Sequence, residues 1–317
     1  MAQRPAVTVL GSLNTDISLL VPHLPAPGET VLASAGATFG AGGKGANQAV
    51  AAARLGAAVS MVGCCGDDEF GARLRAGLAA EGVGVAGLRA VPGVASGLAL
   101  ITVDPAGENS IAVAAGANGL AGDAEVAAAF AQPCDALVLS AEIPVPVLGA
   151  ALRRARAGRV RTVLNLAPVP EGAAGLLAEC PGWLVVNAQE AAALAGRPGD
   201  APTQDEPALG RDAAAGLAAG LGGGHVVVTL GAAGAALAGP SGTAAVPGFP
   251  VTAVDTVGAG DAFVGALAVA LASGLDPAAA VTAACAAGAA AATRRGAQAA
   301  LPRPADVLAA TGFAWPA

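Results

Sequence analysis

The hydrophobic residues of this chain fall into short apolar runs that alternate with longer segments of helical spacing. Runs of strand length occupy residues 6–10, 59–62, 136–139, 162–166, 183–186 and 226–230. Helix-like stretches follow at about residues 46–55 and 67–80, and again after each run from residue 136 onward. This alternation predicts an α/β fold in three α/β/α layers, with a mostly parallel central sheet covered by helices on both faces.

A different pattern in the first third of the chain predicts a small antiparallel β lid. Residues 21–30 are rich in proline and cannot form a central strand. Residues 97–103 and 110–114 flank a polar turn and have the pattern of a β-hairpin. We expect the lid to come from residues 16–40 and 96–115, within one domain that spans residues 1–317. Residues 196–210 are polar and indicate a surface loop.

The most informative stretch lies near residue 260. A strand-like run at residues 246–254 leads to a Gly-Ala-Gly turn (Gly258, Ala259, Gly260), and residues 262–272 have the composition of a helix. Asp261 would therefore lie in the first turn of that helix. One interpretation is that the carboxylate stabilises the start of the helix. The other is a general base beside a phosphoryl-binding nest of backbone N–H groups.

Polar residues also follow the predicted strands, at the edge of the sheet where ligands bind in such folds. Asn14 and Asp16 alternate after the first strand and so face the same side. Later strands are followed by Glu142, Asn165, Asn187, Glu190 and the turn from Thr229 to Gly231. Each of these residues alone could be explained as a helix cap or part of a turn, but together they would surround one pocket.

A glycine-rich turn at residues 40–45 precedes the first predicted helix. Its spacing matches G-x-G-x-x-G, but residues 11–39 separate it from the first strand, so it is not a dinucleotide-binding fingerprint. Gly45 follows Lys44 where a P-loop has Ser or Thr. Lys44 is the only lysine in a chain that otherwise uses arginine. Either chance explains this, or a compact, flexible charge is needed there.

Composition excludes several classes of protein. The net charge of −7 argues against general nucleic-acid binding, and no stretch is typical of a membrane span or a secretory signal. The five cysteines lack the spacing of a zinc site and indicate a reducing, cytoplasmic location. With only two histidines, acid–base chemistry would depend on carboxylates, whose oxygen atoms favour magnesium as the metal.

Three ordered motifs carry a family resemblance. They are residues 42–48 (Gly-Gly-Lys-Gly-Ala-Asn-Gln), residues 187–190 (Asn-Ala-Gln-Glu) and residues 255–261 (Asp-Thr-Val-Gly-Ala-Gly-Asp). In these motifs the chain resembles the phosphofructokinase B-type (PfkB) carbohydrate kinases, over residues 11–302. Residues 43–53 and 296–298 are similar to the ribokinase branch of that family.

The resemblance implies ATP-dependent phosphorylation of D-ribose at its 5-hydroxyl, with Asp261 as the base and Gly258, Ala259 and Gly260 as the anion hole. It implies sugar contacts at Asn14, Asp16, Gly42, Gly43, Lys44, Asn47, Glu142 and Asp261. It implies ATP and magnesium contacts at Asn187, Glu190, Thr229, Leu230, Gly231, Ala232, Ala233, Gly234, Gly260 and Cys285. It implies a potassium site at Asp255, Val257, Ala291, Arg294, Gly296 and Ala300, and a homodimer formed through the lid.

Alternatives to this hypothesis remain open from the sequence. A related kinase could act on another sugar or on a nucleoside, although the chain has no tyrosine and few other aromatic residues to stack on a base. A non-catalytic sugar- or nucleotide-binding protein would have no need of Asp261. An NAD-dependent oxidoreductase is disfavoured by the displaced glycine pattern.

Overall fold

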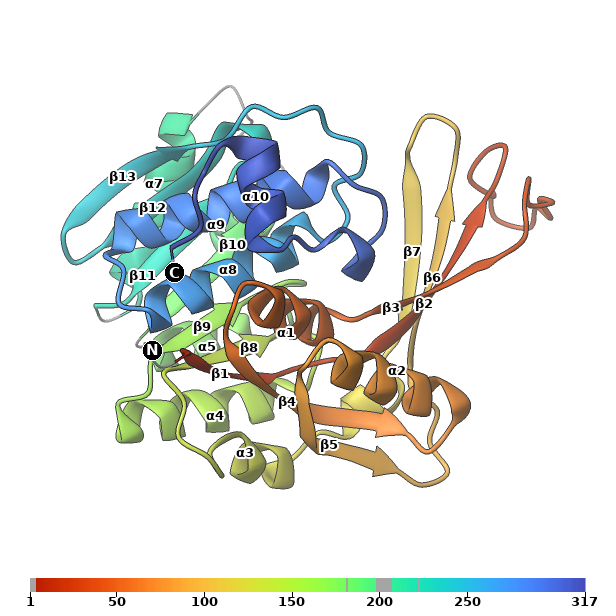
Figure 1. The fold of residues 1–317 in the computed structure, drawn as a ribbon, viewed down its shortest axis with the longest axis horizontal. Helices are drawn as coiled ribbons and strands as arrows, with labels where there is room; N and C mark the ends of the chain where they lie inside the picture. Colours follow the sequence, from red (N-terminus) through yellow and green to blue (C-terminus); the bar gives the residue numbers. More distant parts are fainter. Residues whose placement is uncertain (1–3, 181, 198–206, 222, 317) are drawn as a thin grey trace.

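The computed structural model describes residues 4–180, 182–197, 207–221 and 223–316, and contains two sheets (Figure 1). The larger sheet has nine strands, all parallel from β5 to β11 in spatial order, with an antiparallel hairpin at one edge. Its strands in that order are β13 (Gly242–Pro247), β12 (Gly234–Gly239), β11 (His225–Thr229), β10 (Trp183–Asn187), β9 (Thr162–Asn165), β8 (Ala136–Ser140), β1 (Ala6–Leu10), β4 (Ala58–Gly66) and β5 (Gly84–Val91). The predicted mostly parallel sheet is confirmed.

Helices cover both faces of this sheet because successive strand residues point to opposite sides. Val9 packs in one apolar cluster and Leu10 in the other. The first face carries α1 (Lys44–Arg54), α2 (Glu69–Ala80), α8 (Ala259–Ala272), α9 (Pro277–Ala292) and α10 (Pro304–Thr311). The second carries α3 (Asp123–Ala129), α4 (Val145–Gly158), α5 (Ala173–Glu179), α6 (Ala188–Leu194) and α7 (Pro207–Ala219). Short 3-10 turns lie at η1 (Gly116–Leu120), η2 (Gly231–Ala233) and η3 (Gln298–Ala300).

The strand order creates a crevice beside β1. The chain passes from β1 to β4 on one side and later returns to β8 on the other. The loops that leave the carboxyl ends of β1 and β8 therefore diverge, and a ligand can enter between them. Asn14 follows β1 and Glu142 follows β8, so both lie at this crevice.

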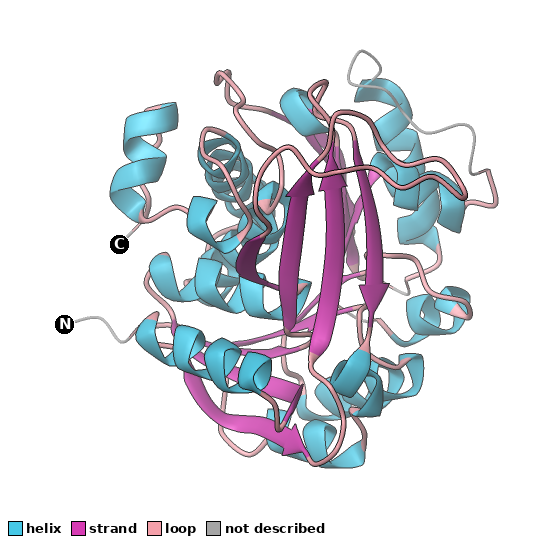
Figure 2. Cartoon of the chain, turned by 90° about the vertical axis from the view of Figure 1, so that its right-hand side faces the viewer, coloured by secondary structure: helices cyan, strands magenta, loops and turns pink. Residues whose placement is uncertain are grey.

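The smaller sheet has four strands and projects from the main body (Figure 1). Its order is β3 (Thr38–Gly42), β2 (Asn14–Leu20), β6 (Gly97–Val103) and β7 (Asn109–Ala114). Figure 2, which views the molecule from that side, shows these strands in front of the larger body. The two outer pairs are antiparallel as predicted, but β2 and β6 are parallel. This follows because β2 and β6 continue from β1 and β5, which point the same way.

The structure corrects several boundaries. The strand predicted at residues 246–254 ends at Pro247, because Pro247 and Pro250 lack the N–H groups that a sheet ladder needs. The following helix begins at Ala259 rather than residue 262. Of the loop predicted at residues 196–210, residues 198–206 lie outside the described parts, and α7 already begins at Pro207, a favoured first helical residue. Strands β5 and β12 were not predicted.

Two helices rich in alanine, α8 and α9, are buried around most of their circumference. No helix among the residues that the structure describes is long and apolar enough to cross a membrane. Glycine brings α8 close to α1: a Cβ atom at Gly265 would lie 2.6 Å from the Cβ of Ala51 and 2.8 Å from the carbonyl oxygen of Gln48. The two helices therefore touch backbone to backbone at this point.

We predict that Gly265→Ala lowers the free energy of unfolding by about 1–3 kcal/mol, because the added methyl group must separate α1 from α8. The exposed Gly77 in the middle of α2 is the matched control, since nothing lies within 4 Å of a Cβ atom there. Gly77→Ala should stabilise the protein by about 0.5–1 kcal/mol through helix propensity. Urea unfolding measures both changes, and equal effects of the two substitutions would contradict the close contact.

Candidate active site

The turn that begins α8 has the geometry of an anion-binding nest. Gly258 precedes the helix with φ of 79°, a conformation that favours glycine. A Cβ atom there would lie 3.0 Å from the carbonyl oxygen of Ala297, so the turn is also tightly packed. The first N–H groups of a helix lack intrahelical acceptors and carry the positive end of the helix dipole. Gly258 and Gly260 line a cavity of about 200 Å³ into which these groups can donate.

Asp261 lies in the first turn of α8, as predicted, but its carboxylate does not cap the helix. Its Oδ2 accepts a hydrogen bond of 2.8 Å from Asn47 Nδ2, and its Oδ1 accepts one of 3.0 Å from Gln48 Nε2. Only 8% of Asp261 is exposed. Burial raises the pKa of Asp261, while Lys44 and the two amides oppose that rise. The carboxylate is therefore held by α1, which favours the interpretation as a base over that as a cap.

The cavity gathers side chains from the carboxyl ends of several strands. Besides the turn and Asp261, its lining comprises Lys44, Asn165, Ala167, Val185, Val186, Asn187, Glu190, Thr229, Thr256 and Val264. Eight residues proposed from the sequence thus line one cavity: Lys44, Asn165, Asn187, Glu190, Thr229, Gly258, Gly260 and Asp261. The other residues implied as ATP contacts, Leu230 to Gly234 and Cys285, do not line this cavity.

A second group of polar residues lies beside the cavity, at the crevice next to β1. Glu142 accepts hydrogen bonds from the Lys44 backbone N–H (3.0 Å) and from the Ser12 hydroxyl. Burial would lower the pKa of Lys44, but the carboxylates of Asp261, Glu142 and Glu190 raise it above its usual value. Lys44 therefore keeps its charge and serves as the counter-ion of this acidic site.

Two glycines allow these polar groups to come together. Gly43 has φ of 85°, and a Cβ atom there would lie 2.7 Å from the Asn14 nitrogen. A Cβ atom at Gly42 would lie 2.1 Å from Asp16 Oδ2, so the carboxylate packs directly on the glycine backbone. Burial, together with Glu142 and Asp261, raises the pKa of Asp16 to about 6.

The nucleotide residues proposed from the sequence also have structural roles. Asn187 Oδ1 accepts from the Glu190 N–H (2.8 Å), and Glu190 Oε2 accepts from the Asn187 N–H (2.7 Å), which forms a capping box at α6. Burial raises the pKa of Glu190, with Lys44 opposing. Cys285 packs in the core of α9, where burial raises the pKa of its thiol to about 12.

The residues proposed for a potassium site surround the end of α9. Asp255 accepts from the N–H groups of Val257 (3.0 Å) and Gly296 (2.9 Å), and so ties two loops together. Ala291 lies in the last turn of α9 and Ala300 is fully buried in η3, whereas the Arg294 guanidinium points to Asp306. No cluster of three His, Cys, Asp or Glu side chains suited to a metal occurs within the described ranges.

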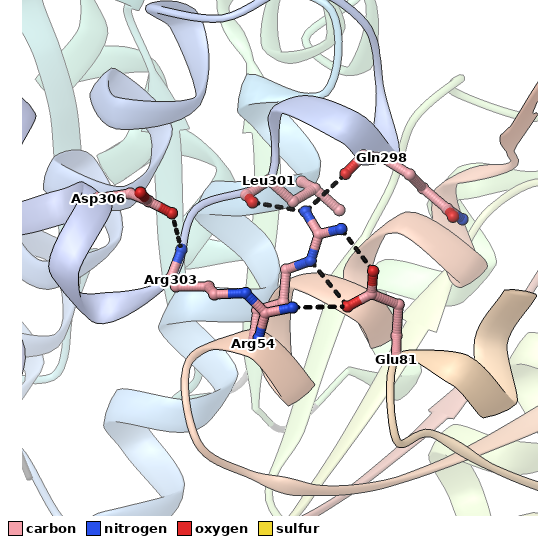
Figure 3. Close-up of polar contacts among 6 residues, drawn as sticks. All are labelled: Arg54, Glu81, Gln298, Leu301, Arg303 and Asp306. Atoms are coloured by element: carbon pink, nitrogen blue, oxygen red, sulfur yellow. Dashed lines mark hydrogen bonds and ion pairs between the residues drawn. The ribbon is translucent and has the colours of Figure 1, made fainter.

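Arg54 at the end of α1 fixes the segment that packs behind the glycine turn (Figure 3). Its guanidinium donates to the carbonyl oxygens of Gln298 (2.8 Å) and Leu301 (2.7 Å) and pairs with Glu81 (2.6 Å). Arg303 donates to the same carboxylate at 3.3 Å. Because Ala297 touches Gly258, this cluster supports the anion-binding turn from behind.

Three supporting residues were not proposed as site residues from the sequence. Ser12 holds Glu142, Gln48 holds Asp261, and Asn118 Nδ2 donates to Asn14 Oδ1 at 2.8 Å. Gln48 stands next to Asn47 in the glycine motif, which was a usable signal. Asn118 lies far along the chain, on η1, and no local pattern indicates its contact.

Comparison with known proteins identifies the family of the chain. Residues 4–304 match the model of the pfkB family carbohydrate kinases. The chain is 38% identical over 277 residues to a ribokinase of Schizosaccharomyces pombe, covering 84% of this chain and 86% of the relative. It is 35% identical over 307 residues to a ribokinase of Haemophilus influenzae, covering 96% and 98%. It is 34% identical over 299 residues to a deoxyribokinase of Salmonella typhi, covering 93% and 95%.

Solved structures have the same fold. The ribokinase of Thermotoga maritima superimposes with a TM-score of 0.80 at 32% identity, covering 96% of this chain and 98% of the other. The ribokinase of Arabidopsis thaliana, complexed with ribose and ATP, gives a TM-score of 0.81 at 29% identity, with coverage of 97% and 98%. The fold class predicted from the sequence is thereby confirmed.

We predict that Asp16→Asn stabilises the protein at neutral pH. The pKa of Asp16 is about 6 in the folded protein and 3.8 as a model value, so the native state binds its proton more tightly. Wild-type stability should therefore fall as the pH rises from about 4 to about 6. The variant should lack this fall and gain about 1–2 kcal/mol at pH 7, after allowance for partial solvent screening.

Urea unfolding at pH 4 and pH 7 measures this effect. Asp212→Asn is the control, because Asp212 is exposed on α7 and has little desolvation to relieve. If Asp16→Asn raises the free energy of unfolding equally at both pH values, the raised pKa of Asp16 is contradicted.

Proposed function

Because the chain belongs to the PfkB family of carbohydrate kinases, we propose that it transfers the γ-phosphate of ATP to the 5-hydroxyl of D-ribose. The products are D-ribose 5-phosphate and ADP. The observation that carries this proposal is the buried carboxylate of Asp261, which lies beside the N–H groups of a glycine turn and is held from a neighbouring helix. A sugar-binding protein without catalysis would have no use for this pairing of a base with an anion site.

Asp261 accepts the proton of the sugar 5-hydroxyl. As this proton leaves, the hydroxyl oxygen bonds to the γ-phosphorus of ATP, and the bond from that phosphorus to the ADP oxygen breaks. A pKa raised by burial suits this role, because a stronger base takes the proton more readily. The N–H groups of Gly258, Ala259 and Gly260 stabilise the charge that develops on the phosphoryl oxygens.

The pentose lies in the crevice beside β1. Amide and carboxylate groups suit vicinal hydroxyls because together they donate and accept hydrogen bonds. Lys44 balances the negative charge of the site and approaches both the sugar and the phosphate region. The sugar contacts are Asn14, Asp16, Gly42, Gly43, Lys44, Asn47, Glu142 and Asp261.

ATP lies along the carboxyl ends of β10 and β11. Asn187, Glu190 and Thr229 border the triphosphate. The nucleoside lies beside the turn through Leu230, Gly231, Ala232, Ala233 and Gly234, and its adenine ring lies near Cys285. Preference for D-ribose rests on the ribokinases among the relatives, one of which is complexed with ribose and ATP. Deoxyribose is the second candidate, because a relative named deoxyribokinase is nearly as similar.

The proposal includes two metal ions, magnesium and potassium. Magnesium is bound mainly by nucleotide phosphates, so one carboxylate such as Glu190, which lines the cavity, is sufficient. For potassium, the end of α9 lies against the Asp255 segment, because the Ala292 carbonyl oxygen accepts from the N–H groups of Val254 (2.8 Å) and Asp255 (3.2 Å). Its oxygen ligands would come from Asp255, Val257, Ala291, Arg294, Gly296 and Ala300, mostly through carbonyls. Both ions supply positive charge when bound, which favours binding of the triphosphate.

A coupled ADP-release assay with ATP and magnesium tests the function. D-ribose, 2-deoxyribose, fructose and adenosine should each be tested with and without potassium. We expect the highest kcat/KM for D-ribose and an increase with potassium. If turnover is highest on another substrate, the pocket binds that substrate instead of D-ribose, and the assignment of Asp261 as the base is unaffected.

Asp261→Asn distinguishes catalysis from binding in the same assay. It preserves the shape of the side chain and removes the base, so turnover should fall by about 100- to 10,000-fold. Binding of D-ribose, measured by calorimetry, should be nearly unchanged. Turnover close to that of the wild type would remove Asp261 from the mechanism.

We also propose that two copies of the chain pair through the small sheet. Its strands expose large apolar side chains on both faces, with Phe39 (59% exposed) and Leu100 (49%) on one, and Ile111 (53%) and Val113 (55%) on the other. An exposed apolar group of this kind, on a sheet with two open edges, is typical of an interface between subunits. Analytical ultracentrifugation should show a dimer that Ile111→Asp dissociates. Leu308→Asp on α10, at a site 51% exposed, is the control and should stay dimeric. A monomeric wild type would contradict the pairing.

A further inference from the structure

Gln48 links the proposed base, Asp261, to the backbone of the central sheet through a buried chain of hydrogen bonds. Its side-chain Nε2 donates to Asp261 Oδ1 (3.0 Å) and to Asn165 Oδ1 (2.9 Å). Asn165, at the end of β9, donates in turn from Nδ2 to the Val185 carbonyl oxygen on β10 (3.2 Å). Gln48 is fully buried, and Asn165 is 7% exposed.

The backbone carbonyl fixes the orientation of both amides. The Val185 oxygen can only accept, so Asn165 must turn its NH₂ group toward it and its Oδ1 toward Gln48. Gln48 must then present its own NH₂ group, whose second hydrogen points to Asp261 Oδ1. A flipped Gln48 would place its Oε1 against two acceptor oxygens. A donor is therefore always directed at the carboxylate.

Asn47 cannot fill this role throughout a reaction. It donates to the other oxygen of Asp261 and belongs to the proposed sugar contacts, so a bound sugar would compete with Asp261 for its amide. Gln48 is anchored on Asn165 and has no open side. Its Oε1 accepts no hydrogen bond from the residues that the structure describes, so the NH₂ group carries all of its anchoring.

We propose that Gln48, oriented by Asn165, is a positioning residue that holds the Asp261 carboxylate in the direction needed to accept the substrate proton. This rests on the proposed function of Asp261 as the base. The charged groups that face Asp261 are Lys44 on α1, Glu142 after β8 and Asp16 on β2. Gln48 adds a neutral donor to this set, so it orients the carboxylate without the larger loss of basicity that a second cation would cause.

Gln48→Leu removes the donor and keeps a similar volume. We expect kcat to fall by about 10- to 100-fold at pH 7, with the KM for the sugar changed by less than about threefold. The hydrogen bond favours the charged carboxylate, so without it the acid limb of the pH–kcat profile should move up by about one pH unit or more. The loss of activity should therefore shrink at higher pH.

Two further variants separate positioning from general damage. Asn165→Ala leaves Gln48 in place but frees its amide to rotate, so the same changes should appear in smaller measure. Ser140→Ala is the matched control, because Ser140 is fully buried and its hydroxyl has no partner among the described residues. It should leave kcat, KM and the pH profile unchanged.

A titration that does not depend on activity completes the test. In protein labelled with ¹³Cγ-aspartate, the Asp261 signal is assigned by its loss in Asp261→Asn and followed against pH by NMR. Its pKa should be higher in Gln48→Leu, or in Asn165→Ala if Gln48→Leu does not fold. An unchanged titration, or a change in KM alone, would overturn the positioning role. If the wild type phosphorylates no sugar, the proposed function fails, and the NMR titration still decides whether Gln48 controls Asp261.

Discussion

The burial of one carboxylate, Asp261, is the constraint on which the rest of the site depends. A buried charge is costly unless it is paired and hydrogen-bonded. Here Lys44 supplies the charge, and Asn47 and Gln48 supply the hydrogen bonds, all from the first half of α1. The proposed base and its support thus come from helices more than two hundred residues apart in sequence, as the separation of Asn47 and Asp261 shows. Activity would therefore depend directly on how these two helices pack.

The unusual composition of the chain has a physical reason in this packing. Side chains as short as those of Asn47 and Gln48 reach Asp261 only if α1 and α8 approach closely. Gly265 and the alanines around it allow that approach, and Arg54 holds the far end of α1 to the segment behind the anion-binding turn. The lone lysine has a related explanation, because Lys44 lies among three carboxylates and a compact ammonium group can serve as their shared counter-ion.

The sequence predicts the frame of the molecule and the position of the site better than the connections within the site. Buried apolar runs indicate the parallel strands, and polar residues after them indicate the edge where the cavity lies. Strand β5 carries glycine and arginine between its apolar residues, so its pattern is weak. The parallel pairing of β2 with β6 depends on the directions of β1 and β5 and cannot be read locally. The contacts of Gln48 with Asn165 and of Asn118 with Asn14 depend on how distant elements are rotated and packed.

The most direct measurement of the central claim is a crystal structure with D-ribose, ADP, magnesium and aluminium fluoride, a mimic of the transferring phosphoryl group. The account predicts that the fluoride ligands accept hydrogen bonds from the backbone N–H groups at Gly258–Gly260. It also predicts that the 5-hydroxyl lies within hydrogen-bond distance of the Asp261 carboxylate, in line with the aluminium. A fluoride bound away from this turn, or a sugar whose 5-hydroxyl faces a different carboxylate, would contradict it.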